Sequence, residues 1–112
     1  MDIDEIETKI IEEVEAESGF MMQLRVHNTF DEQALTTLLK TIEDYNRLLG
    51  NSKYINRDVV FMLTSTLEII RGIENRFDAM SDPRKKQVSN AIRKLSRDMD
   101  YLLDLRSRPK NL

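Results

Sequence analysis

The sequence predicts an all-α protein, an up-down-up-down four-helix bundle formed by a single domain over residues 1–112. Three stretches carry apolar residues at alternating spacings of three and four, and this spacing places them on one face of an α-helix. The chain contains only 3 Gly and 2 Pro, so we expect few turns. The predicted helices are therefore long and most connections between them are short.

The first predicted helix spans residues 3–26. Its apolar face is formed by Ile3, Ile6, Ile10, Val14, Met21 and Leu24. Gly19 falls inside this helix, and residues 20–26 also show the alternation of a strand, which would have to pair across a dimer because the chain has no second strand candidate. A further alternative ends the helix at residue 18 and gives a three-helix bundle with an acidic N-terminal arm.

The second predicted helix runs from about residue 30 to residue 49. Thr29 and Glu32 have the spacing of a capping box at its start, and Gly50 is a normal stop signal at its end. Its core face consists of Leu35, Leu38, Ile42, Tyr45 and Leu49. The loop that follows spans residues 50–56.

The third predicted helix runs from residue 57 to about residue 80 and is capped by Asn56. Its core face consists of Leu63, Thr66, Ile70, Ile73, Phe77 and Met80. Gly72 lies in its interior, where glycine costs about 1 kcal/mol relative to alanine. Either a close helix crossing or simple tolerance would account for that glycine.

The fourth predicted helix begins at Pro83, since proline suits the first helical position, and runs to about residue 106. Its core face consists of Val88, Ile92, Leu95, Met99 and Leu102. The joint before it is only about two residues long, which predicts an antiparallel hairpin of the third and fourth helices.

Composition excludes several functions. The chain has no cysteine, which rules out disulfides, thiolate metal sites and thiol catalysis and is compatible with a cytoplasmic location. The acidic N-terminus does not resemble a secretory signal, and no apolar run approaches the ~20 residues of a membrane span. We therefore expect a cytoplasmic protein that does not enter the membrane.

Charge is distributed unevenly along the chain. Residues 1–18 contain eight acidic groups and one lysine, whereas residues 81–112 contain nine basic and four acidic groups. One interpretation is intramolecular, with the acidic helix lying beside the basic one. The other is that one end of the molecule meets an oppositely charged partner.

No catalytic or cofactor-binding pattern is recognisable. His27 is the only histidine and is predicted at a helix end without an adjacent nucleophile. Glu12 and Glu15 are predicted to form a solvated face rather than a metal site, and Met80 and Met99 fall on core faces rather than in a haem site. We therefore predict no enzymatic activity, no metal and no cofactor.

The predicted binding residues are Lys86, Arg93, Arg97 and Tyr54. The three cations share the outer face of the fourth helix, on which no aromatic side chain is expected. Tyr54 and Ile55 lie in the longest loop, where they either anchor a partner or plug the end of the bundle. The predicted function is non-enzymatic and regulatory protein–protein interaction, as an adaptor, an inhibitor or immunity-type protein, or a small subunit of an assembly. The alternative is an accessory nucleic-acid-binding protein that uses the basic start of the fourth helix; a homodimer is a further option.

Overall fold

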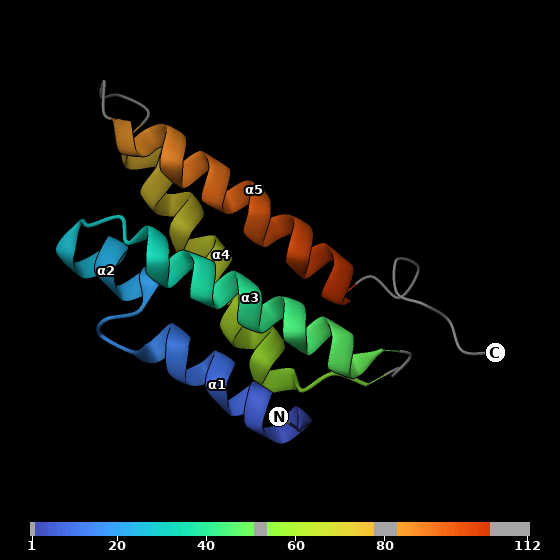
Figure 1. The fold of residues 1–112 in the computed structure, drawn as a ribbon. Helices are drawn as coiled ribbons and strands as arrows, with labels where there is room; N and C mark the ends of the chain where they lie inside the picture. Colours follow the sequence, from blue (N-terminus) through green and yellow to red (C-terminus); the bar gives the residue numbers. More distant parts are fainter. Residues whose placement is uncertain (1, 51–53, 78–82, 104–112) are drawn as a thin grey trace.

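The computed structural model describes residues 2–50, 54–77 and 83–103, and these ranges contain five α-helices and no strand. The helices are α1 (Ile3–Glu15), α2 (Phe20–His27), α3 (Glu32–Leu49), α4 (Arg57–Phe77) and α5 (Pro83–Leu103). The predicted class, an all-α helical bundle, is confirmed (Figure 1). A strand at residues 20–26 was wrong, because these residues lie in α2.

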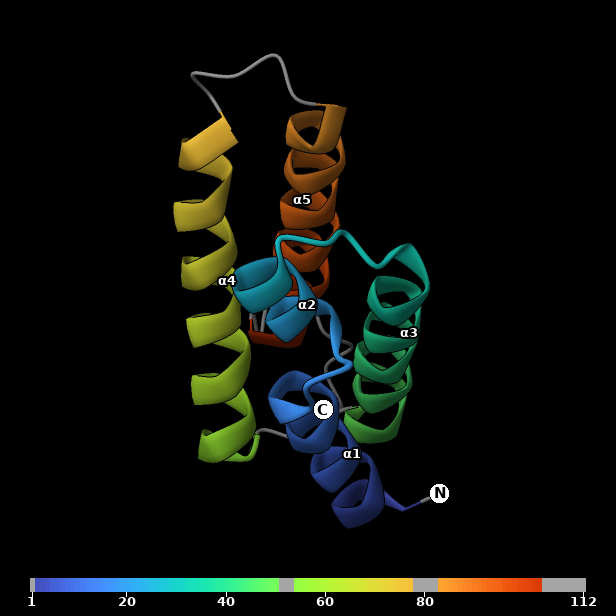
Figure 2. The ribbon, with the colours of Figure 1, turned by 90° about the vertical axis from the view of Figure 1, so that its left-hand side faces the viewer.

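The helices are arranged so that α1 and α5 lie diagonally across the bundle. α1 packs against α3 and α4, and α5 packs against the same two helices. Figure 2 shows α5 behind α1 and α2, with α4 and α3 on the two sides. The order around the bundle is therefore α1, α3, α5, α4, which the sequence did not predict.

The first predicted helix is broken, so a continuous helix over residues 3–26 was wrong. α1 ends at Glu15, where Ala16 has an extended backbone with a ψ of 138°, and α2 begins after Gly19. A Cβ atom at Gly19 would lie 2.2 Å from the carbonyl oxygen of Glu13, so only glycine lets the chain fold this closely onto the last turn of α1. The break allows each short helix to bury its own apolar side chains.

The N-terminal segment is docked on the bundle, and the alternative of a three-helix bundle with an acidic arm was wrong. α1 buries Ile6, Ile10 and Val14, with Ile3 partly buried. α2 buries Phe20, Met21 and Leu24 and packs against α1, α3 and α4. Together the two helices complete the side of the bundle that faces away from α5.

The start of α3 differs from the prediction. The capping residue is Asp31, whose carboxylate accepts a hydrogen bond from the Ala34 backbone N–H at 3.0 Å, so the predicted box of Thr29 and Glu32 was wrong. The physical reason is that the Thr29 hydroxyl donates to the His27 carbonyl at 3.2 Å and so does not cap α3. Between Thr29 and Asp31, the ring of Phe30 packs edge-on against Phe20 with centroids 5.2 Å apart. The predicted stop at Gly50 is confirmed by its φ of 49°.

The other helix ends follow the sequence signals. Asn56 caps α4, since its side-chain oxygen accepts a hydrogen bond from the Asp58 N–H at 2.8 Å. α5 begins at Pro83, and α4 and α5 pack side by side as the predicted hairpin. The predicted ends of these helices, near residues 80 and 106, lie outside the described residues.

The core matches the predicted faces closely. All five predicted positions of α3 are buried, as are Leu63, Thr66, Ile70 and Ile73 of α4. In α5, Ile92 is only partly buried and Ala91 takes its place in the core. Met99 is buried as expected, whereas Met80 lies outside the described residues and the side chain of Phe77 is not described.

Gly72 lies on an exposed part of α4, and no atom of a neighbouring helix lies within 4 Å of the position that a Cβ would take there. A close helix crossing is therefore not its explanation. The glycine is tolerated at a surface position, at a cost to the helix of about 1 kcal/mol relative to alanine.

We expect the α4–α5 hairpin to be the most sensitive part of the core. Ile70 is fully buried and Leu95 is 1% exposed, so Ile70→Ala or Leu95→Ala should each lower the free energy of unfolding by ~2–5 kcal/mol. Chemical denaturation monitored by circular dichroism measures this loss. An unchanged denaturation midpoint for either variant would show that its side chain is not in the core.

Docking of α1 should also contribute to stability. Ile10 of α1 is fully buried. Both Ile10→Ala and deletion of residues 1–15 should therefore lower the free energy of unfolding. Ile3, only partly buried, provides a matched control, for which Ile3→Ala should cost less. Random-coil amide signals for residues 3–15 in the intact protein would contradict the docked arrangement.

Candidate interaction surface

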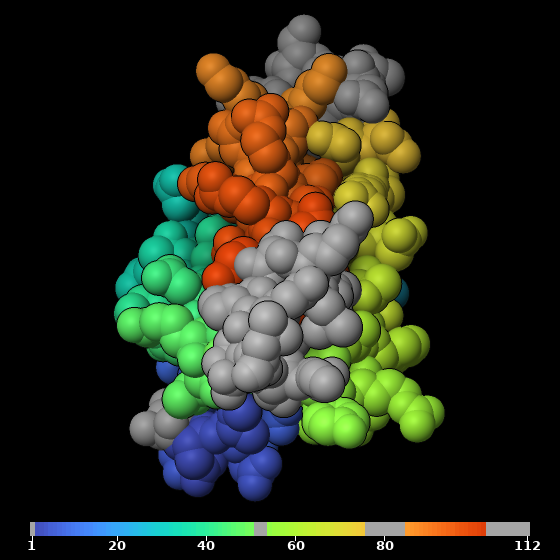
Figure 3. All heavy atoms as spheres, turned by 90° about the vertical axis from the view of Figure 1, so that its right-hand side faces the viewer, coloured from blue at the N-terminus to red at the C-terminus, as the bar shows by residue number. Residues whose placement is uncertain are grey.

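The outer face of α5 carries a row of cations. Lys86, Arg93 and Arg97 are exposed and are separated by seven and four residues, which keeps them on one side of the helix. Lys94 is exposed beside them. Figure 3 shows this part of α5 open to solvent between α3 and α4. The structure thus brings the three predicted cationic residues together on one surface.

The sequence positions this surface by burying the opposite side of the helix. Val88, Ala91 and Leu95 are at most 1% exposed, which turns the cations outward. Two polar contacts join α5 to α4: the Ser89 hydroxyl donates to Glu74 at 2.5 Å, and Arg71 donates to the Ser96 hydroxyl at 3.3 Å. The cations therefore belong to a helix that is held in place by its buried apolar side chains and by these hydrogen bonds to α4.

The cations of this surface are not engaged in ion pairs with the described residues. Among the described residues, Lys86, Arg93, Lys94 and Arg97 form no ion pair within 4 Å, and the ion pairs present there all lie within single helices. The expected packing of the acidic helix beside the basic one was wrong, because α1 lies diagonally opposite α5. The acidic side chains of α1 and the basic side chains of α5 therefore lie on opposite faces of the molecule.

The far end of the α5 surface changes character. Asp100 is exposed there, and Tyr101 is 44% exposed, so the expectation that this face has no aromatic side chain was wrong. Asp98 and Tyr101 line a shallow groove against Glu43, Asn46 and Arg47 of α3. Partial burial raises the pKa of Asp98; the charge of Arg97 opposes this rise and that of Glu43 adds to it.

Tyr54 is not part of the same surface. It is 84% exposed and lies just before α4, at the end of the α4–α5 hairpin remote from Lys86. Its neighbour Ile55 is partly buried against the core. Ile55 therefore packs at this end of the bundle as predicted for a plug, whereas the exposed Tyr54 does not fill the end of the bundle.

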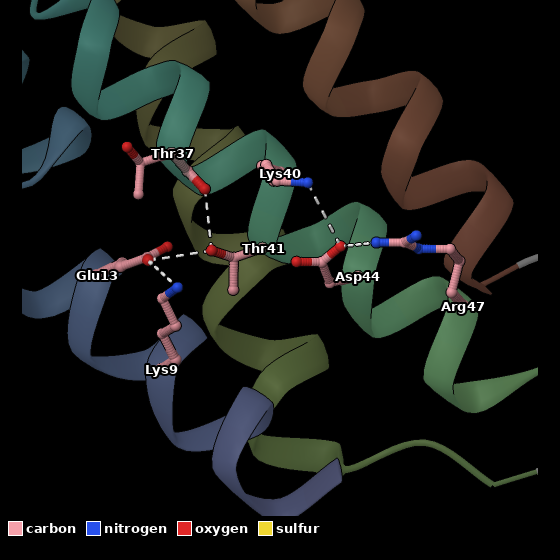
Figure 4. Close-up of polar contacts among 7 residues, drawn as sticks. All are labelled: Lys9, Glu13, Thr37, Lys40, Thr41, Asp44 and Arg47. Atoms are coloured by element: carbon pink, nitrogen blue, oxygen red, sulfur yellow. Dashed lines mark hydrogen bonds and ion pairs between the residues drawn. The ribbon is translucent and has the colours of Figure 1, made fainter. Parts of the chain in front are cut away.

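Polar contacts between α1 and α3 were missed by the sequence analysis. The Thr41 hydroxyl donates to Glu13 at 3.0 Å, and the buried Tyr45 hydroxyl donates to Glu7 at 2.5 Å (Figure 4 shows the first of these). Asn56 also donates to Glu7, at 3.3 Å. Only the positions of Thr41 and Tyr45 next to an apolar face could have suggested that these hydroxyls need partners.

Glu13 is held in an unfavourable environment for a charge. One carboxylate oxygen accepts from Thr41 and lies 3.9 Å from the Lys9 ammonium, whereas the other is shielded from solvent and has no hydrogen-bond partner. Burial raises the pKa of this carboxyl, and the Thr41 hydrogen bond and Lys9 partly offset the rise. Glu13 therefore fastens α1 at an energetic cost.

The second polar group in Figure 4 lies on the surface of α3. Asp44 pairs with both Lys40 and Arg47, whose side chains are 70% and 68% exposed. Such exposed pairs contribute at most about 1 kcal/mol, so they orient side chains without holding the fold together.

The remaining candidate residues lie on the surface of the described part of the chain. His27 is exposed at the end of α2, and Glu12 and Glu15 are exposed on α1 as expected of a solvated face. Within the described ranges, no three His, Asp or Glu side chains gather as a metal site, and no helix there has the length and apolarity to cross a membrane. The outer face of α5 is thus the strongest candidate surface.

Comparison with known proteins does not extend this assignment: no family model, no curated protein and no solved structure matches the chain.

The buried carboxyl of Glu13 gives a pH-dependent prediction. Its pKa is higher in the folded chain than the ordinary value of 4.5, so folding takes up a proton as the pH falls towards that value. The free energy of unfolding of the wild type should therefore rise relative to that of Glu13→Gln as the pH falls from about 7 towards 4.5.

Urea denaturation at a series of pH values measures this difference, with Glu12→Gln as the control because Glu12 is an exposed neighbour on the same helix. A constant stability difference between wild type and Glu13→Gln at every pH would contradict the raised pKa.

Proposed function

We propose that this protein acts without catalysis, as a regulatory binding protein that docks an acidic surface of another protein on the outer face of α5. The observation that carries the proposal is the row formed by Lys86, Arg93, Lys94 and Arg97, which is exposed and forms no ion pair within 4 Å with any described residue. Such a row attracts an oppositely charged partner. Its main effect is to fix the register of the partner, and its contribution to the binding affinity is smaller. An adaptor, an inhibitor or a small subunit of an assembly would each use such a surface.

The rigidity of the platform supports this role. The backbone of α5 is supported on both sides, through Ser89 and Ser96 towards α4 and through Asn46, whose amide donates to the Asp98 carbonyl at 3.5 Å. A partner that binds here meets side chains whose backbone is already ordered, which limits the entropic cost of association. The absence of cysteine suits a cytoplasmic setting for such binding.

Nucleic-acid binding is the second candidate, and Tyr101 is the observation that favours it. Its partly exposed ring follows Arg97 by four residues, so a base could stack beside a phosphate-binding cation. Asp98 and Asp100 stand at the same end and would repel a continuous phosphate backbone. A protein partner, whose charge can change sign along its length, fits this surface better.

The test compares an acidic probe peptide with nucleic acid. Fluorescence anisotropy at about 150 mM salt, where the Debye length is about 8 Å, should show saturable binding of a glutamate-rich helical peptide and none of duplex or single-stranded DNA. Arg93→Glu/Arg97→Glu should abolish peptide binding because the row becomes acidic. The matched control Arg25→Glu/Arg57→Glu changes two exposed arginines on α2 and α4 and should leave binding unchanged.

Two outcomes would overturn the proposal. Equal loss of binding in the control would show that only net charge matters. Micromolar binding of DNA that only the Arg93→Glu/Arg97→Glu variant loses would make the protein a nucleic-acid binder, with a salt dependence of about −0.9 per phosphate contacted on a duplex.

A further inference from the structure

The molecule carries a second charged surface, on the side opposite the basic row. This acidic face consists of Asp4, Glu5, Glu12 and Glu15, all exposed on α1. Lys9 is the one cation of α1, and its ammonium lies 3.9 Å from Glu13, at the edge of α1 that faces α3. The outward charge of α1 is therefore negative along its length.

The two surfaces cannot meet within one molecule. α1 and α5 pack on opposite sides of α3 and α4, and the two ribbon views agree that α5 lies behind the bundle when α1 and α2 face the viewer (Figures 1 and 2). Because both faces belong to the docked bundle, rotation about a linker cannot bring them together. A partner for either face must come from outside the molecule.

The charges of the two faces have matching spacings. Glu5 and Glu12 are seven residues apart on α1, as are Lys86 and Arg93 on α5, and at 1.5 Å per residue both intervals are about 10 Å along the helix axis. A third exposed charge follows on each face, at Glu15 three residues after Glu12 and at Arg97 four residues after Arg93. Two helices laid parallel would therefore place three acidic groups opposite three basic ones.

We propose that the acidic face of α1 in one copy of this protein docks on the basic row of α5 in a second copy. The contact is head-to-tail, so each copy keeps one face open and the chain of copies can grow. Exposed ion pairs are individually weak, so association requires protein concentrations on the order of millimolar at low salt. Self-association covers the surface assigned above to a protein partner, and the two modes of binding therefore compete.

The experiment measures mass as a function of salt and of charge. Sedimentation equilibrium of the full chain at about 20 mM salt should give an average mass that rises with concentration, and at about 500 mM salt the mass should fall to that of the monomer because the charges are screened. Two variants each remove one face: Glu5→Lys/Glu12→Lys and Arg93→Glu/Arg97→Glu. Each alone should be monomeric at low salt.

Mixing the two variants provides the decisive result. The first variant is basic on both faces and the second is acidic on both faces, so mixing them restores opposite charges across the contact, and the equimolar mixture should associate although neither variant does so alone. Controls with the same changes of net charge elsewhere, Glu32→Lys/Glu68→Lys and Arg25→Glu/Arg57→Glu, should associate like the wild type. Circular dichroism of all variants checks that they are folded.

A wild type that stays monomeric at low salt, a mixture that does not associate, or controls that lose association would each overturn the proposal. This proposal shares the basic row with the proposed function, so Arg93→Glu/Arg97→Glu affects both. The two are told apart by Glu5→Lys/Glu12→Lys, which should lose self-association and keep binding of the acidic peptide.

Discussion

The close approach of the chain to itself at Gly19 determines the arrangement of the bundle. Because no Cβ is present there, the backbone can turn against the carbonyl of Glu13 and send α2 in a new direction. α1 then lies between α3 and α4, where it buries Ile6, Ile10 and Val14. Once that position is filled by α1, α5 completes the bundle on the opposite side.

This arrangement decides where the charges lie. If α1 had packed beside α5, its carboxylates would have neutralised the basic row, and the molecule would have had no strongly charged surface to offer a partner. The diagonal placement instead separates the two charged helices by the full thickness of the core. The resulting surfaces of opposite sign can orient an approaching partner before contact, an effect that weakens as salt is added.

The sequence predicted those parts of the fold that depend on local spacing. The apolar faces of α3 and α4, the stop at Gly50 and the cap at Asn56 follow from residues a few positions apart, and the structure confirms them. The break at Gly19 could not be predicted in this way, because it depends on a distance to a carbonyl in the preceding helix. The sequence offered two local caps for α3, and the structure uses Asp31 because the Thr29 hydroxyl donates to His27.

The candidate surface was predictable in part for the same reason. Helical periodicity was sufficient to place Lys86, Arg93 and Arg97 on one outer face, but whether acidic residues cover that face depends on the order of the helices around the core. Tyr101 was overlooked because its position borders both the outer face and the α3 groove, where partial exposure depends on the neighbouring helix. The same prediction was made for Tyr54 and Ile55, which are adjacent in the chain, although Ile55 is partly buried against the core and Tyr54 is exposed.

Two kinds of contact attach α1 to the bundle, namely buried apolar side chains and two hydroxyl–carboxylate hydrogen bonds. The two kinds affect the stability of docking differently. The apolar contacts of Ile10 stabilise α1 at any pH, whereas the buried carboxyl of Glu13 opposes docking when it is charged. A leucine at that position would remove the cost but also the hydrogen bond from Thr41, leaving that buried hydroxyl only its bond to the Thr37 carbonyl at 2.9 Å. Glu13 therefore lowers the stability of the fold when it is charged, but its hydrogen bond with Thr41 fixes the position of α1 against α3. The orientation of the acidic face depends on that position.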